Sequence, residues 1–454
     1  MLALGALAAA VLGGRLGAGD LVGDPVIYAA LAKAAVRRGE WATQWLAGRP
    51  FFDKPPLVVW LTALSFRLFG VATWSARLPS VACAVGCCLA TTTLGARIGG
   101  RRVGLAAGAV LALTPGFIRF GSTLFLDAPF VLCALLGFHA TLDAWARDGR
   151  GLWRAGAWFG LAFMAKGAQT LVVPAILVGT WVVGGAERPP FRALVAAGAA
   201  FVAVTLPWHA WELWRWGGAF VAGTVSDVTE KLGDAPALAV YVRAVAETTL
   251  PWLPLALTGV WRTARGGLRT PALRLLAVWT ALAYGVLLAA GKQSPRYLML
   301  VHPALAIWTA LAVAPWLPAT PRLARAVGAA AAVAWVAMLA WPRALHPTGV
   351  RDAVVALAPA LGPSPDPVQG FRLRHEGTRA RFYYYLDRDV RSSDQPDVLA
   401  ELPPGTPIVA AARYAPELAA DGRFAEAKRS RDFVVFRPVG MAPPDAIPQG
   451  ASLR

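Results

Sequence analysis

The sequence predicts a mainly α-helical polytopic membrane protein, a bundle of about eleven transmembrane helices followed by a small C-terminal α/β domain. Of the 454 residues, 57% are apolar and only 15% are charged, and the mean hydropathy is +0.51. Soluble domains carry about 45–50% apolar and about 25% charged residues. The composition therefore excludes a disordered protein, a coiled coil and an ordinary cytosolic enzyme.

Apolar runs that approach the about 20 residues needed to cross a bilayer recur through the first three quarters of the chain. They lie at about 1–19, 77–96, 103–121, 126–146, 152–168, 170–186, 191–211, 240–261, 272–290, 297–317 and 322–342. The first run lacks a basic leading segment and is expected to be a membrane helix, not a cleaved signal peptide. The run 57–70 is shorter and holds Arg67, so we expect an interfacial or re-entrant helix in the first outer loop.

Charges in the gaps between these runs predict the orientation. The gaps 97–102, 147–154, 187–192, 262–274 and 322–325 together hold 14 basic and 2 acidic residues. The alternate short gaps hold 5 of each sign. Basic loops stay cytoplasmic, which makes this an inner-membrane protein with residues 346–454 on the periplasmic side. The bias also accounts for the net charge of +18, so no nucleic-acid partner is expected.

The tail from residue 346 changes character, and the sequence predicts two domains, 1–345 and 346–454. Charges, prolines and short alternating runs replace the long apolar stretches. Residues 381–386, 407–411 and 432–437 are typical of strands, and residues 350–361 of a helix.

Polar residues outside the tail gather at the ends of spans on the predicted outer face. Ionisable groups at membrane depth are costly and mark functional sites. Three of the six lysines belong to this set. Its members are Asp24, Asp53 and Lys54 in the first loop, Asp127 at the fourth span, Lys166 at the end of the fifth, and Lys292, Arg296 and Tyr297 before the tenth.

Carboxylates and cations at one interface could act together in a group-transfer reaction. A carboxylate accepts a proton from an attacking hydroxyl group. Lysine and arginine bind a phosphate leaving group and stabilise its developing charge. Such a site suits a substrate with a lipid tail and a polar head.

Structural roles compete with this interpretation. Asp24 and Asp127 could cap the first turns of helices. Lys166 before Gly167 fits a cationic helix end, and Arg296 could anchor a span. Lys54 is harder to explain structurally, because two prolines follow it and hold the chain extended.

Metal and disulfide chemistry have little support in the sequence. The four cysteines all lie inside apolar runs, and the five histidines show no ligand spacing. We therefore expect no disulfide framework and no zinc site.

Several short motifs, in this order, resemble bacterial membrane glycosyltransferases of the C superfamily, in particular the lipid A aminoarabinose transferases and protein O-mannosyltransferases. The motifs are Asp24–Ala29, Phe51–Leu57, Leu68–Gly70, Ala76–Ser80, Leu126–Pro129, Ala165–Gly167, Leu206–Trp208, Lys292–Leu298 and His302–Ala304. The resemblance covers about residues 20–310.

The resemblance implies a sugar donor on a polyprenyl phosphate, undecaprenyl phosphate in a bacterium, and transfer with inversion on the periplasmic face. It implies that Asp24 is the catalytic carboxylate and Asp127 a second one. It implies that Lys54, Lys292 and Arg296, with Lys166, bind the donor phosphate. Tyr28, Asp53 and Tyr297 would line the site.

Departures from the family pattern leave the acceptor open. Pro25 follows Asp24 where the family often has an Asp-Glu pair, which weakens a role for a divalent metal ion. The lysine–proline–proline element follows Asp53 in place of glutamate. The predicted spans are also fewer than in the aminoarabinose transferases, so the acceptor stays open: a lipid, a glycan or a protein.

Two other classes stay open. A lipid-linked sugar transporter is disfavoured, because transporters show internal repeats and midplane binding residues. A non-catalytic envelope assembly protein would not need the clustered lysines.

Overall fold

The computed structural model describes residues 1–14, 16–17, 19–184, 189–232, 238–289, 294–340, 349–363 and 367–439. The chain forms two compact units. The first comprises Met1–Gly19, Ala32–Gln44 and Pro50–His346, and the second comprises Asp20–Leu31, Trp45–Arg49 and Pro347–Arg454.

The first unit is helical. Its helices are α1 (Leu2–Gly13), α3 (Leu57–Phe69), α4 (Thr73–Ala112), α5 (Pro115–Gly121), α6 (Asp127–Trp145), α7 (Trp153–Lys166), α8 (Val172–Gly184), α9 (Phe191–Trp216), α10 (Gly218–Leu232), α11 (Leu238–Thr249), α12 (Leu253–Gly266), α13 (Pro271–Ala289), α14 (His302–Val313) and α15 (Thr320–Ala340). Three 3₁₀ turns join them: η1 (Gly167–Leu171), η2 (Pro295–Leu300) and η3 (Ala314–Trp316). Helix α2 (Asp24–Arg38) belongs partly to each unit.

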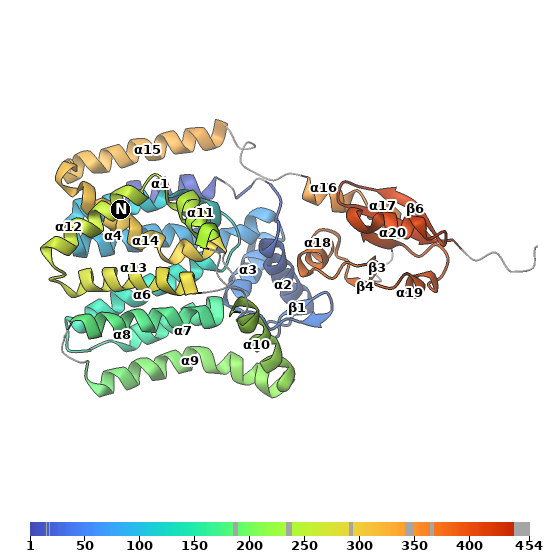
Figure 1. The fold of residues 1–454 in the computed structure, drawn as a ribbon, viewed down its shortest axis with the longest axis horizontal. Coiled ribbons are helices and arrows are strands. Elements are labelled where there is room, and N and C mark those ends of the chain that lie inside the picture. Colours follow the sequence, from blue (N-terminus) through green and yellow to red (C-terminus); the bar gives the residue numbers. More distant parts are fainter. Residues whose placement is uncertain are drawn as a thin grey trace, which may run out of the picture. The chain divides into compact units, whose positions relative to one another are not determined.

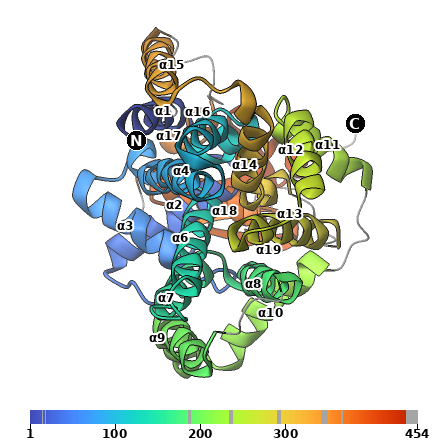
Figure 2. The same cartoon turned by 90° about the vertical axis from the view of Figure 1, so that its left-hand side faces the viewer.

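The bundle is built from neighbouring helix pairs (Figures 1 and 2). Helix α7 packs against α6 and α9, α4 against α1 and α14, and α8 against α13. Among the described residues, five helical stretches are long and apolar enough to span a membrane: Thr73–Ala112, Asp127–Trp145, Trp153–Gly184, Phe191–Trp216 and Pro271–Leu288. The predicted multi-pass membrane protein is thereby confirmed, whereas the count of about eleven spans stays a prediction.

Lipid-facing surface is evident on the outer helices of the bundle. In α9 only 17% of the most apolar window is buried within the protein. Its Phe191 is 80% exposed, and Val182 of α8 is 73% exposed. Apolar surface of this extent is unfavourable in water, and its burial in lipid is favourable.

Gly100 divides α4 into two antiparallel arms. Its φ of +84° is a conformation that only glycine adopts without strain. The arms then approach closely, since a Cβ atom on Gly104 would lie 2.4 Å from the Thr92 carbonyl oxygen. The predicted runs 77–96 and 103–121 correspond to these arms and α5.

The predicted run 240–261 also divides into two helices, α11 and α12, around Pro251. Proline lacks the amide that a continuous helix needs.

The second unit contains a five-stranded mixed sheet of order β4-β3-β5-β7-β6. Its strands are β3 (Val368–Phe371), β4 (Val390–Ser393), β5 (Ile408–Ala411), β6 (Phe424–Arg429) and β7 (Phe433–Pro438). Strand β3 pairs in parallel with β4 and β5, whereas β7 pairs antiparallel with β5 and β6. Its helices are α16 (Val350–Val355), α17 (Ala358–Leu361), α18 (Glu376–Leu386), α19 (Pro396–Ala400) and α20 (Ala415–Ala420), with the turn η4 (Ala412–Tyr414). A two-stranded hairpin, β1 (Trp45–Leu46) and β2 (Arg49–Pro50), lies in the first loop.

The sheet corrects one prediction for the tail. Strands predicted at 407–411 and 432–437 are confirmed as β5 and β7. The strand predicted at 381–386 is wrong, because these residues form the end of α18. The aromatic run favours a strand locally, but His375 caps the helix by accepting a hydrogen bond from the Gly377 amide, and Phe382 is fully buried in the core. Residues 350–361 form two short helices, α16 and α17, since Pro359 cannot continue the first.

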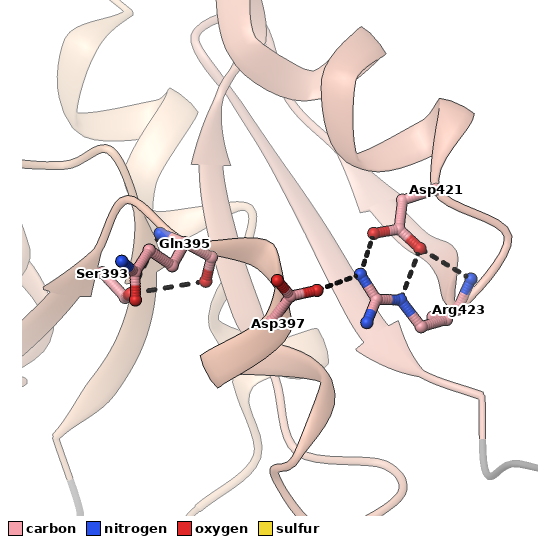
Figure 3. Close-up of polar contacts among 5 residues, drawn as sticks. All are labelled: Ser393, Gln395, Asp397, Asp421 and Arg423. Atoms are coloured by element: carbon pink, nitrogen blue, oxygen red, sulfur yellow. Dashed lines mark hydrogen bonds and ion pairs between the residues drawn. The ribbon is translucent and has the colours of Figure 1, made fainter.

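One arginine joins α19 to the start of β6 (Figure 3). The Arg423 guanidinium donates hydrogen bonds to Asp397 at 2.8 Å and to both carboxylate oxygens of Asp421, at 2.8 and 2.6 Å. These bonds to Arg423 hold the pKa of Asp421 below its usual range. A turn nearby is closed by Ser393, whose hydroxyl donates to the Gln395 carbonyl at 3.4 Å (Figure 3) and accepts from the Gln395 amide at 3.2 Å.

Candidate active site

Asp127 and Lys166 form a buried ion pair where α6 begins and α7 ends. Their side chains are only 3% and 7% exposed. Helix α7 ends at Lys166 because Gly167 follows with φ +73° and ψ −142°, a backbone region almost confined to glycine. The turn before α6 is fixed by Ser80, whose hydroxyl donates to the Phe125 carbonyl at 3.1 Å. The start of α6 and the end of α7 therefore place opposite charges together in an apolar setting.

The turn η2 adds aromatic and cationic groups to this pair. The Lys166 ammonium nitrogen lies 4.9 Å from the Tyr297 ring centre and 5.2 Å from that of Phe130. The guanidinium carbon of Arg296 lies 5.5 Å from the centre of the Tyr297 ring and 5.4 Å from the centre of the Phe125 ring. Cation–π contacts of this kind are strongest where water is excluded.

The segment that carries Asp53 and Lys54 packs against the end of α7. A Cβ atom on Gly167 would lie 3.3 Å from Cδ of Pro55. The Lys54 carbonyl accepts a hydrogen bond from the Gln44 side-chain amide at 2.6 Å, and the Lys54 ammonium group donates to the Asp53 carbonyl at 3.0 Å. The first loop thus brings Lys54 to the side of the bundle that holds Lys166.

Three tryptophans and a buried glutamate fasten the chain just before this segment. The indole nitrogens of Trp60 and Trp208 donate to the carbonyls of Trp41 and Ala42, at 2.6 and 2.9 Å. The Thr43 hydroxyl accepts from the Trp216 indole at 3.1 Å and donates to Glu212 at 3.0 Å.

Glu212 was not among the sequence candidates. It is fully buried, and only one of its carboxylate oxygens is hydrogen-bonded. A carboxylate among tryptophans at the end of a span, as in Trp211–Trp216, was the available signal.

The middle of the chain matches a protein-family model. Residues 53–211 match the model for dolichyl-phosphate-mannose-protein mannosyltransferase. An undecaprenyl phosphate-alpha-4-amino-4-deoxy-L-arabinose arabinosyl transferase from Serratia proteamaculans is 26% identical over 292 residues, which are 61% of this chain and 52% of that protein. The chain spans about half the length of the curated relatives it matches.

Solved structures extend the likeness over nearly the whole fold. The crystal structure of ArnT from Cupriavidus metallidurans bound to undecaprenyl phosphate superposes with a TM-score of 0.78 at 18% identity, covering 97% of this chain and 98% of that one. The Archaeoglobus fulgidus oligosaccharyltransferase AglB, in complex with an inhibitory peptide and a dolichol-phosphate, gives a TM-score of 0.58 at 13% identity, with 91% and 70% covered. In sequence and in fold, the chain is similar to the C-superfamily membrane glycosyltransferases. The resemblance that the motifs carry is confirmed.

Within this superfamily fold, the predicted site residues fall into three groups. Asp127, Lys166, Arg296 and Tyr297 lie together, with the Asp53–Lys54 segment packed against Gly167. Asp24, the first residue of α2, and Tyr28, which is 7% exposed, belong to the second unit. Lys292 lies outside the described residues. The expected interfacial helix 57–70 is α3, only 13 residues long.

Metal-binding groups do not cluster in the part of the chain that the structure describes. No three His, Cys, Asp or Glu side chains there are placed to hold an ion. The four cysteines are unpaired, and Cys87 and Cys88 are fully buried.

Proposed function

We propose that the protein is a polyprenyl-phosphate-sugar-dependent glycosyltransferase that acts on a hydroxyl-bearing acceptor. The observation that carries the proposal is the convergence of Lys54, Arg296 and the buried Asp127–Lys166 pair around one side of the bundle. This convergence involves residues inside the segment 53–211 that matches the mannosyltransferase model. The likeness to ArnT, whose structure holds undecaprenyl phosphate, supports a donor of the same class.

The proposed reaction is a single displacement at the anomeric carbon. The acceptor oxygen forms a bond to that carbon while the bond from the carbon to the phosphate oxygen breaks, which inverts the configuration. A carboxylate takes the acceptor proton, and polyprenyl phosphate leaves with the bonding electron pair. The leaving phosphate gains negative charge, so cations beside it lower the barrier.

The residues divide into roles under this proposal. Asp24 is the general base, and Tyr28 and Asp53 line the site. Lys54, Arg296 and Lys292 bind the donor phosphate. The Asp127–Lys166 pair positions Tyr297, because Lys166 is in contact with both groups. The protein lies in the bacterial inner membrane with the site and residues 346–454 on the periplasmic side, which a reporter fused after Val439 would test.

Purified full-length protein in detergent tests the activity. It is given radiolabelled undecaprenyl-phosphate sugars and host membrane extract, and both release of undecaprenyl phosphate and label in the product are measured. Loss of a general base typically reduces turnover by about 10²–10⁴-fold, which is the expected effect of Asp24→Asn. Asp421→Asn, a surface change in the sheet domain, is the matched control and should transfer at the wild-type rate. Near-normal turnover by Asp24→Asn would remove this residue from the mechanism, and donor binding without release of undecaprenyl phosphate would favour a transporter.

A further inference from the structure

A pocket of about 350 Å³ lies wholly within the second unit, between the β1–β2 hairpin and the start of strands β3 and β4. Three arginines line it: Arg49 from the hairpin, Arg379 from α18 and Arg391 from β4. The remaining polar groups of the lining include Asp389 and Ser392. With three arginines and one aspartate, the residues that line the pocket carry a net positive charge.

The tip of the hairpin lines this pocket in a tight turn. Ala47 and Gly48 are its two central residues, with φ of +49° and +75°. A two-residue turn with positive φ at both positions is the tight hairpin turn that matches the twist of the strands. In this conformation the Cβ atom of Ala47 is strained against the backbone, which glycine would avoid. Such strain concentrates at ligand-binding positions.

The arginine side chains are partly organised before any ligand arrives. The Arg379 Nε atom donates to the Leu373 carbonyl at 3.1 Å, which fixes the plane of its guanidinium group. Partial burial lowers the pKa of Arg379, and the positive charge of Arg49 lowers it further, while Glu376 acts in the opposite direction. Bringing an anion between these two arginines would relieve their mutual repulsion.

The geometry points to an anion-binding pocket, and we propose that it binds a phosphate or carboxylate group carried by a sugar of the acceptor. Arginine presents paired N–H donors that match both oxyanions, which favours these groups over a neutral sugar. A volume of about 350 Å³ is at the small end of ligand sites and suits one sugar with its anionic group. The acceptor assignment rests on the proposed transferase function, whereas binding of the anion does not.

The first experiment measures binding to full-length protein in detergent by calorimetry. The probes are glucose 6-phosphate, glucuronate, inorganic phosphate and glucose. We expect one or both anionic sugars to bind, with affinity falling as salt rises, and glucose not to bind. Arg379→Gln and Arg49→Gln should each weaken binding about 10-fold, about 1.4 kcal/mol. Arg49 is exposed, in strand β2 of the hairpin, so its variant keeps the test valid if Arg379→Gln misfolds.

The control variant is Arg429→Gln on β6, at the opposite edge of the sheet from β4. Equal weakening by Arg429→Gln would overturn the proposal, since it would indicate a diffuse charge effect. Equal affinity for inorganic phosphate and glucose 6-phosphate would also overturn it, because only a free-anion site would remain.

A second measurement separates this inference from the proposed function. In the transfer assay, Arg379→Gln should raise the KM for an anionic acceptor about 10-fold and leave donor hydrolysis unchanged. An unchanged KM would overturn the acceptor subsite while the transferase stands. Persistent anion binding by a protein that consumes no polyprenyl donor would overturn the transferase function instead.

Discussion

Replacing Lys166 by methionine should destabilise the first unit more than any other single change at the site. The variant leaves the Asp127 carboxylate, 3% exposed, without its cation. Removing one partner of a buried pair costs about 3–5 kcal/mol. The contacts with Tyr297 and Phe130, at 4.9 and 5.2 Å, add about 1 kcal/mol each where water is excluded. The expected loss is therefore about 5 kcal/mol in the free energy of unfolding.

Unfolding by sodium dodecyl sulfate titration in mixed micelles measures this loss. Asp127→Asn and the double variant Asp127→Asn with Lys166→Met complete a double-mutant cycle. The double variant carries neither charge of the pair, so it should be more stable than the sum of the single losses predicts, by about 1–3 kcal/mol. Lys428→Met, an exposed lysine on β6, is the control and should change little.

Additive losses in the cycle would refute the reasoning, because they would mean that the two charges do not interact. A second outcome would reassign Lys166. If Lys166→Met unfolds like the wild type but binds undecaprenyl phosphate more weakly, then its ammonium group belongs to the donor site and the pair is incidental.

Three smaller predictions follow from other contacts. Thr43→Val removes a hydroxyl that joins two side chains of α9 and should cost about 1–3 kcal/mol, measured by the same titration. Gly167→Ala should cost more than Gly217→Ala. Both glycines have nearly the same backbone conformation, worth about 1–3 kcal/mol of strain, but only at Gly167 does a proline ring lie 3.3 Å away; equal losses would contradict the contact. Because Arg423 depresses the pKa of Asp421, their bond stabilises the fold above the ordinary aspartate pKa of about 3.9 and is lost as the pH falls through the lower folded value. Asp421→Asn should therefore show a shallower loss of stability in acid, and an unchanged acid limb of the unfolding curve would contradict this.

The architecture was predictable because its signals are local. Apolar runs and basic gaps define membrane helices without knowledge of their partners, and β5 and β7 follow from short alternating segments. Features that depend on contacts between distant residues could not be predicted from the sequence. The aromatic run of α18 has strand propensity, and only its burial with Phe382 in the core makes it a helix. The hairpin arms of α4 depend on the single residue Gly100, whose neighbours also include glycine.

For the site, sequence order indicated which residues gather but not how they pair. Asp127 and Lys166 are 39 residues apart, and their ion pair depends on the packing of α6 against α7. Glu212 was overlooked because its hydrogen bond to Thr43 crosses 169 residues. Pairing of this kind is decided by tertiary contacts, so a list of candidate charges cannot separate ligands from supports.

The distinction between ligand-binding and supporting charges bears on which cations can act in the proposed reaction. A sugar on a polyprenyl phosphodiester carries one negative charge, and the departing phosphate monoester carries about −1.5 to −2. The charge of Lys166 is already balanced by Asp127 in a buried pair, so Lys166 can contribute little to stabilising the additional charge. A group that acts on charge developed in the transition state affects kcat, whereas one that only holds the donor affects KM. Arg296→Gln should therefore lower kcat, and Lys166→Met should lower stability first.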